Sequence, residues 1–133
     1  MSITIRNDLG KTMTFGGHRW LLYLTMAEQF GWKPQGTRKP SGFGLFRKWP
    51  GSYDTSDGQR VARSDASNLA LAIQKALLSE SFDNLVASME AQMKEEVRSQ
   101  VSPELFAAFS IEFDSSIFKE FGLFCDEGSF IIE

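Results

Sequence analysis

The segment His18–Phe30 (HRWLLYLTMAEQF) constrains the fold more than any other part of this chain. If it is wound into a helix, its polar residues gather into one narrow strip, and apolar side chains cover the rest of the circumference. The strip contains His18, Thr25, Glu28 and Gln29. A helix that is apolar on most sides must be buried on most sides. We therefore predict a buried helix over residues 18–30, with the other elements packed around it.

Two segments near the start of the chain have the two-residue alternation of half-buried strands. Ser2–Arg6 and Thr12–Phe15 alternate in this way, and Asn7–Lys11 between them has the Asn, Asp and Gly content of a hairpin loop. Ser129–Ile132 predicts a closing strand beside this hairpin. Together these segments predict a small antiparallel sheet.

Four further helices are expected after residue 63. The first starts with Ser64 or Asp65 as its N-cap, and an alanine-rich stripe on it favours the 18–30 helix as its neighbour. The second covers Phe82–Arg98. A short third runs from a Ser102 cap to about Phe109, and the last is capped by Asp114 or Ser115 and ends at Gly128. The predicted fold is α+β in one globular domain over residues 1–133, with about four helices around the 18–30 helix.

Composition and charge describe an ordinary globular chain with an uneven distribution of charge. Hydrophobic residues make up 42% and charged residues 23% of the 133 residues, and the net charge is −3. Residues 1–79 hold eleven basic and five acidic side chains, whereas residues 80–133 hold three and twelve. With one cysteine, no secretory signal and no apolar run long enough to cross a bilayer, we expect a cytoplasmic protein.

The segment Trp32–Tyr53 has three prolines and four glycines and is predicted to be a long loop. No acid occurs between Gln29 and Tyr53, while basic and aromatic residues alternate there. Long loops in small domains are often functional. The candidate binding residues are Trp32, Arg38, Lys39, Arg47, Lys48, Trp49 and Tyr53. Trp32, Phe43, Phe46 and Trp49 could equally anchor the loop in the core.

Catalytic and metal-binding patterns are poorly supported by the sequence. Cys125 follows a phenylalanine-rich helical stripe and precedes two acids, an environment that favours the neutral thiol, so we expect a core residue rather than a nucleophile paired with His18. One histidine and one cysteine do not make a zinc site. Asp54–Gly58 lacks the glycine and glutamate positions of a calcium loop. We expect no catalytic residue, no metal and no cofactor.

Several spaced motifs resemble one group of small bacterial proteins. The motifs are Gly31–Thr37 (GWKPQGT), Tyr53, Asp57–Val61 (DGQRV), Asp65-Ala66 with Leu69-Ala70, and Phe124–Ile131. That group shares a GWxPxGT, Y, DGQxV, DAxxLAxAL and FCxxGxFxI layout, and no reaction is attached to it. The resemblance implies a bacterial cytosolic protein and is silent about mechanism.

The leading functional hypothesis is a non-enzymatic protein-interaction module, for example an immunity or accessory protein that acts by occlusion. An alternative is a small-ligand binder or weak enzyme, with a cavity walled by Trp32, Trp49, Tyr53 and the 18–30 helix. Its polar contacts would come from His18, Arg19 or Arg38. A third is nucleic-acid binding through the same loop, which the acidic overall charge disfavours. The sequence leaves the oligomeric state open.

Overall fold

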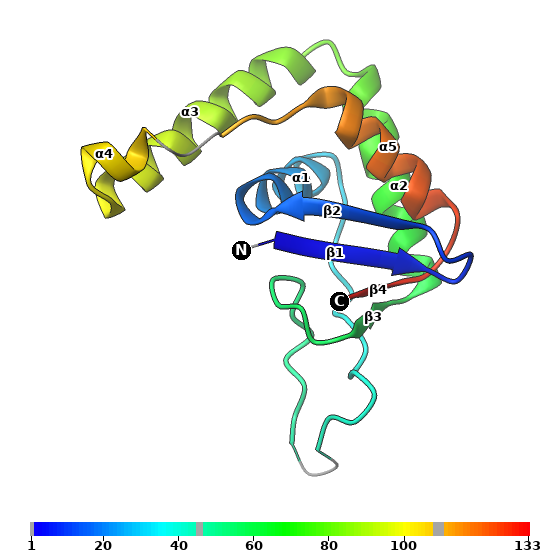
Figure 1. Cartoon of the computed structure of the whole chain (residues 1–133). Helices are drawn as coiled ribbons and strands as arrows, with labels where there is room; N and C mark the ends of the chain where they lie inside the picture. Colours follow the sequence, from blue (N-terminus) through cyan, green and yellow to red (C-terminus); the bar gives the residue numbers. More distant parts are fainter. Residues whose placement is uncertain (1, 45–46, 108–110) are drawn as a thin grey trace.

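The computed structural model describes residues 2–44, 47–107 and 111–133, which contain five helices and a four-stranded antiparallel sheet (Figure 1). The α+β class is therefore as predicted. The strands lie in the order β2-β1-β4-β3. Their bounds are β1 Ser2–Asn7, β2 Thr12–Gly16, β3 Gln59–Val61 and β4 Phe130–Ile132. The helices are α1 Gly17–Gln29, α2 Arg63–Leu78, α3 Phe82–Gln100, α4 Pro103–Phe106 and α5 Ser115–Asp126.

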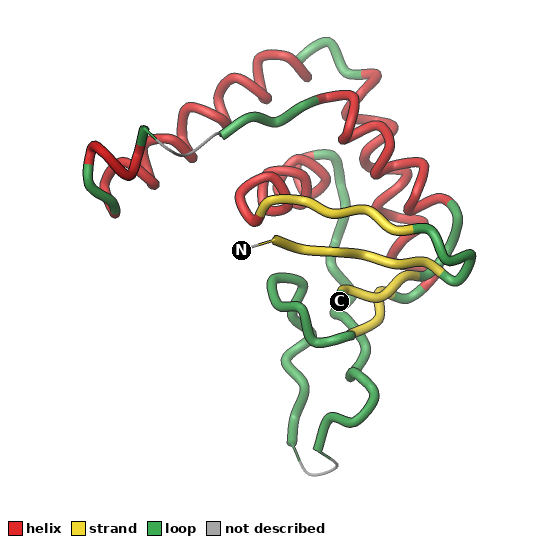
Figure 2. The backbone as a smooth tube through the Cα atoms, viewed as in Figure 1, coloured by secondary structure: helices red, strands yellow, loops and turns green. Residues whose placement is uncertain are grey.

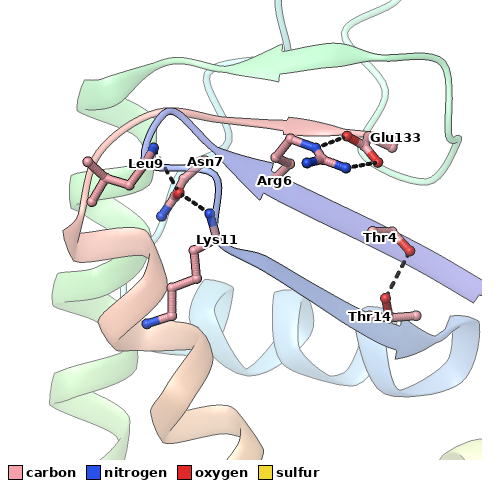
Figure 3. Close-up of polar contacts among 7 residues, drawn as sticks. All are labelled: Thr4, Arg6, Asn7, Leu9, Lys11, Thr14 and Glu133. Atoms are coloured by element: carbon pink, nitrogen blue, oxygen red, sulfur yellow. Dashed lines mark hydrogen bonds and ion pairs between the residues drawn. The ribbon is translucent and has the colours of Figure 1, made fainter.

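The predicted hairpin and the closing strand are both confirmed. β1 pairs with β2 in the register Ile3↔Phe15, and β4 pairs with β1 in the register Ile5↔Ile132. In the hairpin loop, the Asn7 carboxamide oxygen accepts hydrogen bonds from the backbone N–H groups of Leu9 and Lys11 (Figure 3). Alternate residues of β1 are buried, so one face of the sheet carries the core and the other faces outward.

β3 is a strand that the sequence did not predict, and it begins at Gln59. Three residues are too few for a periodic pattern to show. The strand exists because β4, some 70 positions later in the chain, pairs with it in the register Gln59↔Ile132 and Val61↔Phe130.

Helix α1 runs from Gly17 to Gln29, one residue earlier at each end than predicted, and lies against the sheet (Figure 1). Six of its apolar residues are buried, but Leu21 is 40% exposed and lies on the same side as the polar strip. The buried side chains join an aromatic cluster in which the rings of Phe15, Tyr23 and Phe121 pack at centroid distances of 5.4–6.0 Å. This cluster ties α1 to the sheet and to α5.

The start of α2 differs from the prediction. Neither Ser64 nor Asp65 caps the helix, because Ala62 occupies the N-cap position without a side-chain hydrogen bond. The main neighbour of α2 is α5, and α1 is a lesser one. α5 does begin as predicted, with the Asp114 side chain accepting a hydrogen bond from the N–H of Ile117.

α3 and α4 form an arm that extends away from the sheet, and residues 111–114 run alongside α3 toward α5 (Figures 1 and 2). α4 begins at Pro103 with the Ser102 cap expected from the sequence. It ends at Phe106, and the predicted end near Phe109 lies outside the described residues. Only Phe82 and Val97 of α3 are buried.

The α2–α5 contact depends on the absence of a side chain at Gly122. A Cβ atom there would lie 2.7 Å from Cγ2 of Ile73. We expect Gly122→Ala to lower the free energy of unfolding by about 1–2 kcal/mol, because overpacking outweighs the gain of about 1 kcal/mol in helix propensity. Ile73→Leu removes that methyl group while keeping the volume, so the double variant should recover most of the loss in urea titrations. A more stable Gly122→Ala protein would contradict this packing.

Candidate functional site: the loop between α1 and β3

The two ends of the Trp32–Tyr53 segment, here called the basic loop, are held by one buried carboxylate. Asp65, in the first turn of α2, is completely buried. Its Oδ1 accepts a hydrogen bond of 2.8 Å from the indole N–H of Trp32, and its Oδ2 accepts one of 2.5 Å from the hydroxyl of Tyr53. The loop therefore closes on α2 at its base.

Tyr53 links the Asp65 carboxylate to Gly36 in the loop and to Trp20 on α1. Its hydroxyl accepts a hydrogen bond of 2.9 Å from the N–H of Gly36, and its carbonyl accepts one of 2.8 Å from the indole of Trp20 on α1. Burial raises the pKa of Tyr53 well above its ordinary value, and the hydrogen bond and negative charge of Asp65 raise it further. The phenol consequently stays protonated and donates to Asp65.

The two arms of the loop cross just beyond this base. The N–H of Thr37 donates to the carbonyl of Gly51, and the Thr37 hydroxyl donates to the carbonyl of Ser52 at 2.7 Å. The Thr37 hydroxyl also accepts a hydrogen bond of 3.0 Å from the indole of Trp49. Gly36 and Gly51 both have positive φ, and a Cβ on Gly51 would lie 3.2 Å from Cα of Gly36. Glycine is needed here for close approach as well as for conformation.

The loop also covers the outer edge of β3. Arg38 forms an antiparallel bridge with Arg60, its N–H donating to the Arg60 carbonyl at 2.7 Å. The side chain of Gln59, which is buried, donates to the carbonyls of Ser52 and Thr55. An edge strand that would otherwise be open is thus partly occupied by the loop.

Beyond the crossing, the loop presents cations around an aromatic pair. The guanidinium carbon of Arg47 lies 4.6 Å and the ammonium of Lys39 lies 5.8 Å from the centre of the Phe43 ring. Phe43 packs edge-on against Trp49 at 5.2 Å. We call Lys39, Phe43, Arg47, Lys48 and Trp49 the basic-aromatic surface. Lys39, Arg47 and Lys48 are exposed, and within the described parts of the chain none of them pairs with a carboxylate.

The structure divides the seven candidate residues into two groups. Trp32, Trp49 and Tyr53 direct their polar hydrogens into the loop's own contacts, whereas the side chains of Arg38, Lys39, Arg47 and Lys48 are exposed. Phe46 lies outside the described residues. Sequence reasoning missed Asp65, Thr37 and the Gly36–Gly51 crossing. An acid in the first turn of a helix is normally an exposed cap, so Asp65 carried no distinguishing signal.

The other candidate groups lie elsewhere. Cys125 is buried in the core as predicted, and burial, together with the charges of Asp65 and Asp126, raises the pKa of its thiol. Arg19, a proposed ligand contact, donates instead to the carbonyl of Glu112 at 3.1 Å. No group of three His, Cys, Asp or Glu side chains that could hold a metal occurs in the described ranges. Among the same residues, no helix has both the length and the apolarity to cross a membrane.

Comparisons of this chain with protein-family models, with curated proteins and with solved structures find no match. The chain is therefore classified by its structure alone. It is an α+β protein with a basic loop that a buried carboxylate holds at its base.

Proposed function

We propose that this chain is a non-enzymatic protein-interaction module whose basic-aromatic surface docks on an acidic face of a partner protein. The observation that carries the proposal is the contrast between the two ends of the loop. Its base is held by buried hydrogen bonds to Asp65, while its exposed cations have no carboxylate partner among the described residues. Trp, Tyr and Arg are the residues that dominate interface hot spots.

The anchored base supports this function energetically. Ordering a loop on binding costs conformational entropy. Because hydrogen bonds of Thr37 and Trp49 already join the two arms of this loop, it loses less conformational entropy when it binds. The cations would speed the encounter with an acidic partner. In this proposal the other helices pack around α1, so that the basic loop projects from a rigid body.

We further propose that the chain is a bacterial cytosolic protein of the group that shares the GWxPxGT layout, with an immunity- or accessory-like role. The second motif of that layout contributes Tyr53 and the fourth contributes Asp65, so the hydrogen bond between them joins two of the motifs. An inhibitor that acts by occlusion needs a firm surface, and the anchored base of the basic loop fits this requirement.

The test is affinity capture from the source organism with the wild-type chain and with the triple variant Lys39→Ala/Arg47→Ala/Lys48→Ala. We expect the captured protein to bind the variant at least about tenfold more weakly, which corresponds to about 1.4 kcal/mol. The matched control is Arg63→Ala/Lys75→Ala/Lys94→Ala, which removes the same charge from exposed positions on α2 and α3. The control should bind like the wild type.

Four outcomes would redirect the proposal. Failure to capture any stable protein partner, or equal binding by both triple variants, would remove the loop as a protein-docking surface. Binding of a single-stranded oligonucleotide that falls steeply with salt and is lost in the loop variant would assign nucleic acid instead. Binding of a metabolite that survives the loop variant would favour the ligand-binding alternative.

A further inference from the structure

A groove of about 570 Å³ is lined by residues of α2 and α5, and none of its lining residues belongs to the basic loop. Ala70, Ile73 and Gly122 form its apolar floor, and Leu71, Leu77 and Leu123 line its walls. Leu71 is 50% exposed and Leu123 is 59% exposed. Leu78, 80% exposed, continues the face, because it lies two helical turns after Leu71 on the same side of α2.

The polar rim of this groove carries two charges of opposite sign on α5. Lys119 and Asp126 both line the groove, and neither forms an ion pair within residues 2–44, 47–107 and 111–133. Together with Gly122 and Leu123 they occupy positions i, i+3, i+4 and i+7, which is one face of a helix. Along the chain, this face therefore carries a cation, a glycine, a leucine and an anion.

This order of residues is complementary to the same order running in the opposite direction. If a two-fold axis passes between residues 122 and 123, α5 of one copy runs antiparallel to α5 of the other. Lys119 then faces Asp126 of the second copy, and Leu123 faces Gly122, which lies on the floor of the groove. A two-fold interface requires such self-complementarity. No like-charged residues of this face are opposed.

We propose that the α2–α5 groove is a homodimer interface, occupied by α5 of a second copy in this antiparallel arrangement. Leu123 of each copy enters the groove of the other, and the two Lys119–Asp126 pairs close its ends. The interface is separate from the basic-aromatic surface, so the proposal stands or falls independently of the loop's function.

The size of the face predicts a weak, reversible dimer. At 1.5 Å per residue, the two helices are roughly 24 and 18 Å long. Two helices about 10 Å wide therefore offer a footprint of roughly 400 Å², which is below the roughly 800 Å² per partner of a standard stable interface. We expect a dissociation constant in the micromolar range or higher.

Sedimentation equilibrium over a wide range of protein concentrations tests the proposal. The wild-type mass should rise from 14.9 kDa toward twice that value as the concentration increases. Leu123→Glu should remain monomeric throughout while keeping the wild-type thermal unfolding midpoint, because the leucine is largely exposed. The matched control is Leu105→Glu on α4, since Leu105 is 51% exposed but outside the groove, and it should dimerise normally.

The charge swap tests the antiparallel register. Lys119→Asp alone and Asp126→Lys alone place like charges opposite each other and should weaken the dimer at least about tenfold. The double variant Lys119→Asp/Asp126→Lys restores opposite charges and should return the dissociation constant to near the wild-type value. A wild-type monomer at every concentration, a dimer insensitive to Leu123→Glu, or a double variant no better than the single ones would overturn the proposal.

Discussion

Replacing Asp65 with alanine should lower the free energy of unfolding by about 3–5 kcal/mol, because two buried donors lose their acceptor at once. The indole N–H of Trp32 and the hydroxyl of Tyr53 both donate to this carboxylate, which is completely buried. Each hydrogen bond to a charged group is worth about 1.5–3 kcal/mol. Urea unfolding followed by circular dichroism measures the loss.

The matched control is Asp57→Ala, because Asp57 is exposed in the turn before β3 and its removal should change stability by less than about 0.5 kcal/mol. Tyr53→Phe should cost less than Asp65→Ala, and the double variant should lose less than the sum, since the two share one hydrogen bond. A loss below about 1 kcal/mol for Asp65→Ala would contradict its role as the anchor.

Asp65→Ala should also change amide hydrogen exchange in the basic loop. Without Asp65 the base of the basic loop is no longer tied to α2, so backbone amides such as Thr37 N–H, which is bonded to Gly51, should exchange faster. Amides in the middle of β1 should exchange at a rate set only by the global stability. This difference separates release of the loop from general destabilisation.

Tyr23→Ala should also lower the free energy of unfolding by about 3–5 kcal/mol, since it empties a large site at the centre of the aromatic cluster. Tyr23 is fully buried, its ring lies within 5.0–6.0 Å of four phenylalanine rings, and its hydroxyl donates to the carbonyl of Asp114. Chemical denaturation of the purified variant, compared with the wild type at the same pH, gives the value.

Leu21→Ala, two residues away on α1, is the control. Leu21 is 40% exposed and on the outward strip of the helix, so its truncation should cost less than about 1 kcal/mol. Equal losses at positions 21 and 23 would mean that α1 is buried on a different side. Tyr23→Phe should fall between the two, because it keeps the packing and loses only the hydrogen bond to Asp114.

Local patterns were sufficient for several elements. The alternation in Ser2–Arg6 and Thr12–Phe15 predicted β1 and β2, and the short apolar segment Ser129–Ile132 predicted β4. The caps at Ser102 and Asp114 could be found because a side chain that bonds to a nearby backbone N–H needs only neighbours in sequence. The binding loop could be located by composition alone, since prolines and glycines exclude regular structure there.

The remaining features depend on residues far apart in the chain. β3 is a strand only because β4 reaches it, and the identity of Asp65 as an anchor rather than a cap depends on donors from residues 32 and 53. The inward or outward direction of each loop side chain also depends on these contacts. Composition could name the loop residues but could not separate the tryptophans that hold the loop from the cations that it presents.

The sequence by itself determined the α+β class, the hairpin, the first residues of α3, α4 and α5 and the burial of Cys125, because periodicity and capping are local properties of a chain. Only the tertiary structure decided which side chains of the basic loop point inward, where Asp65 lies, and that α2 and α5 leave a groove between Leu71 and Leu123. The physical reason is that buried hydrogen bonds and helix packing join residues whose separation in sequence carries no periodic signal.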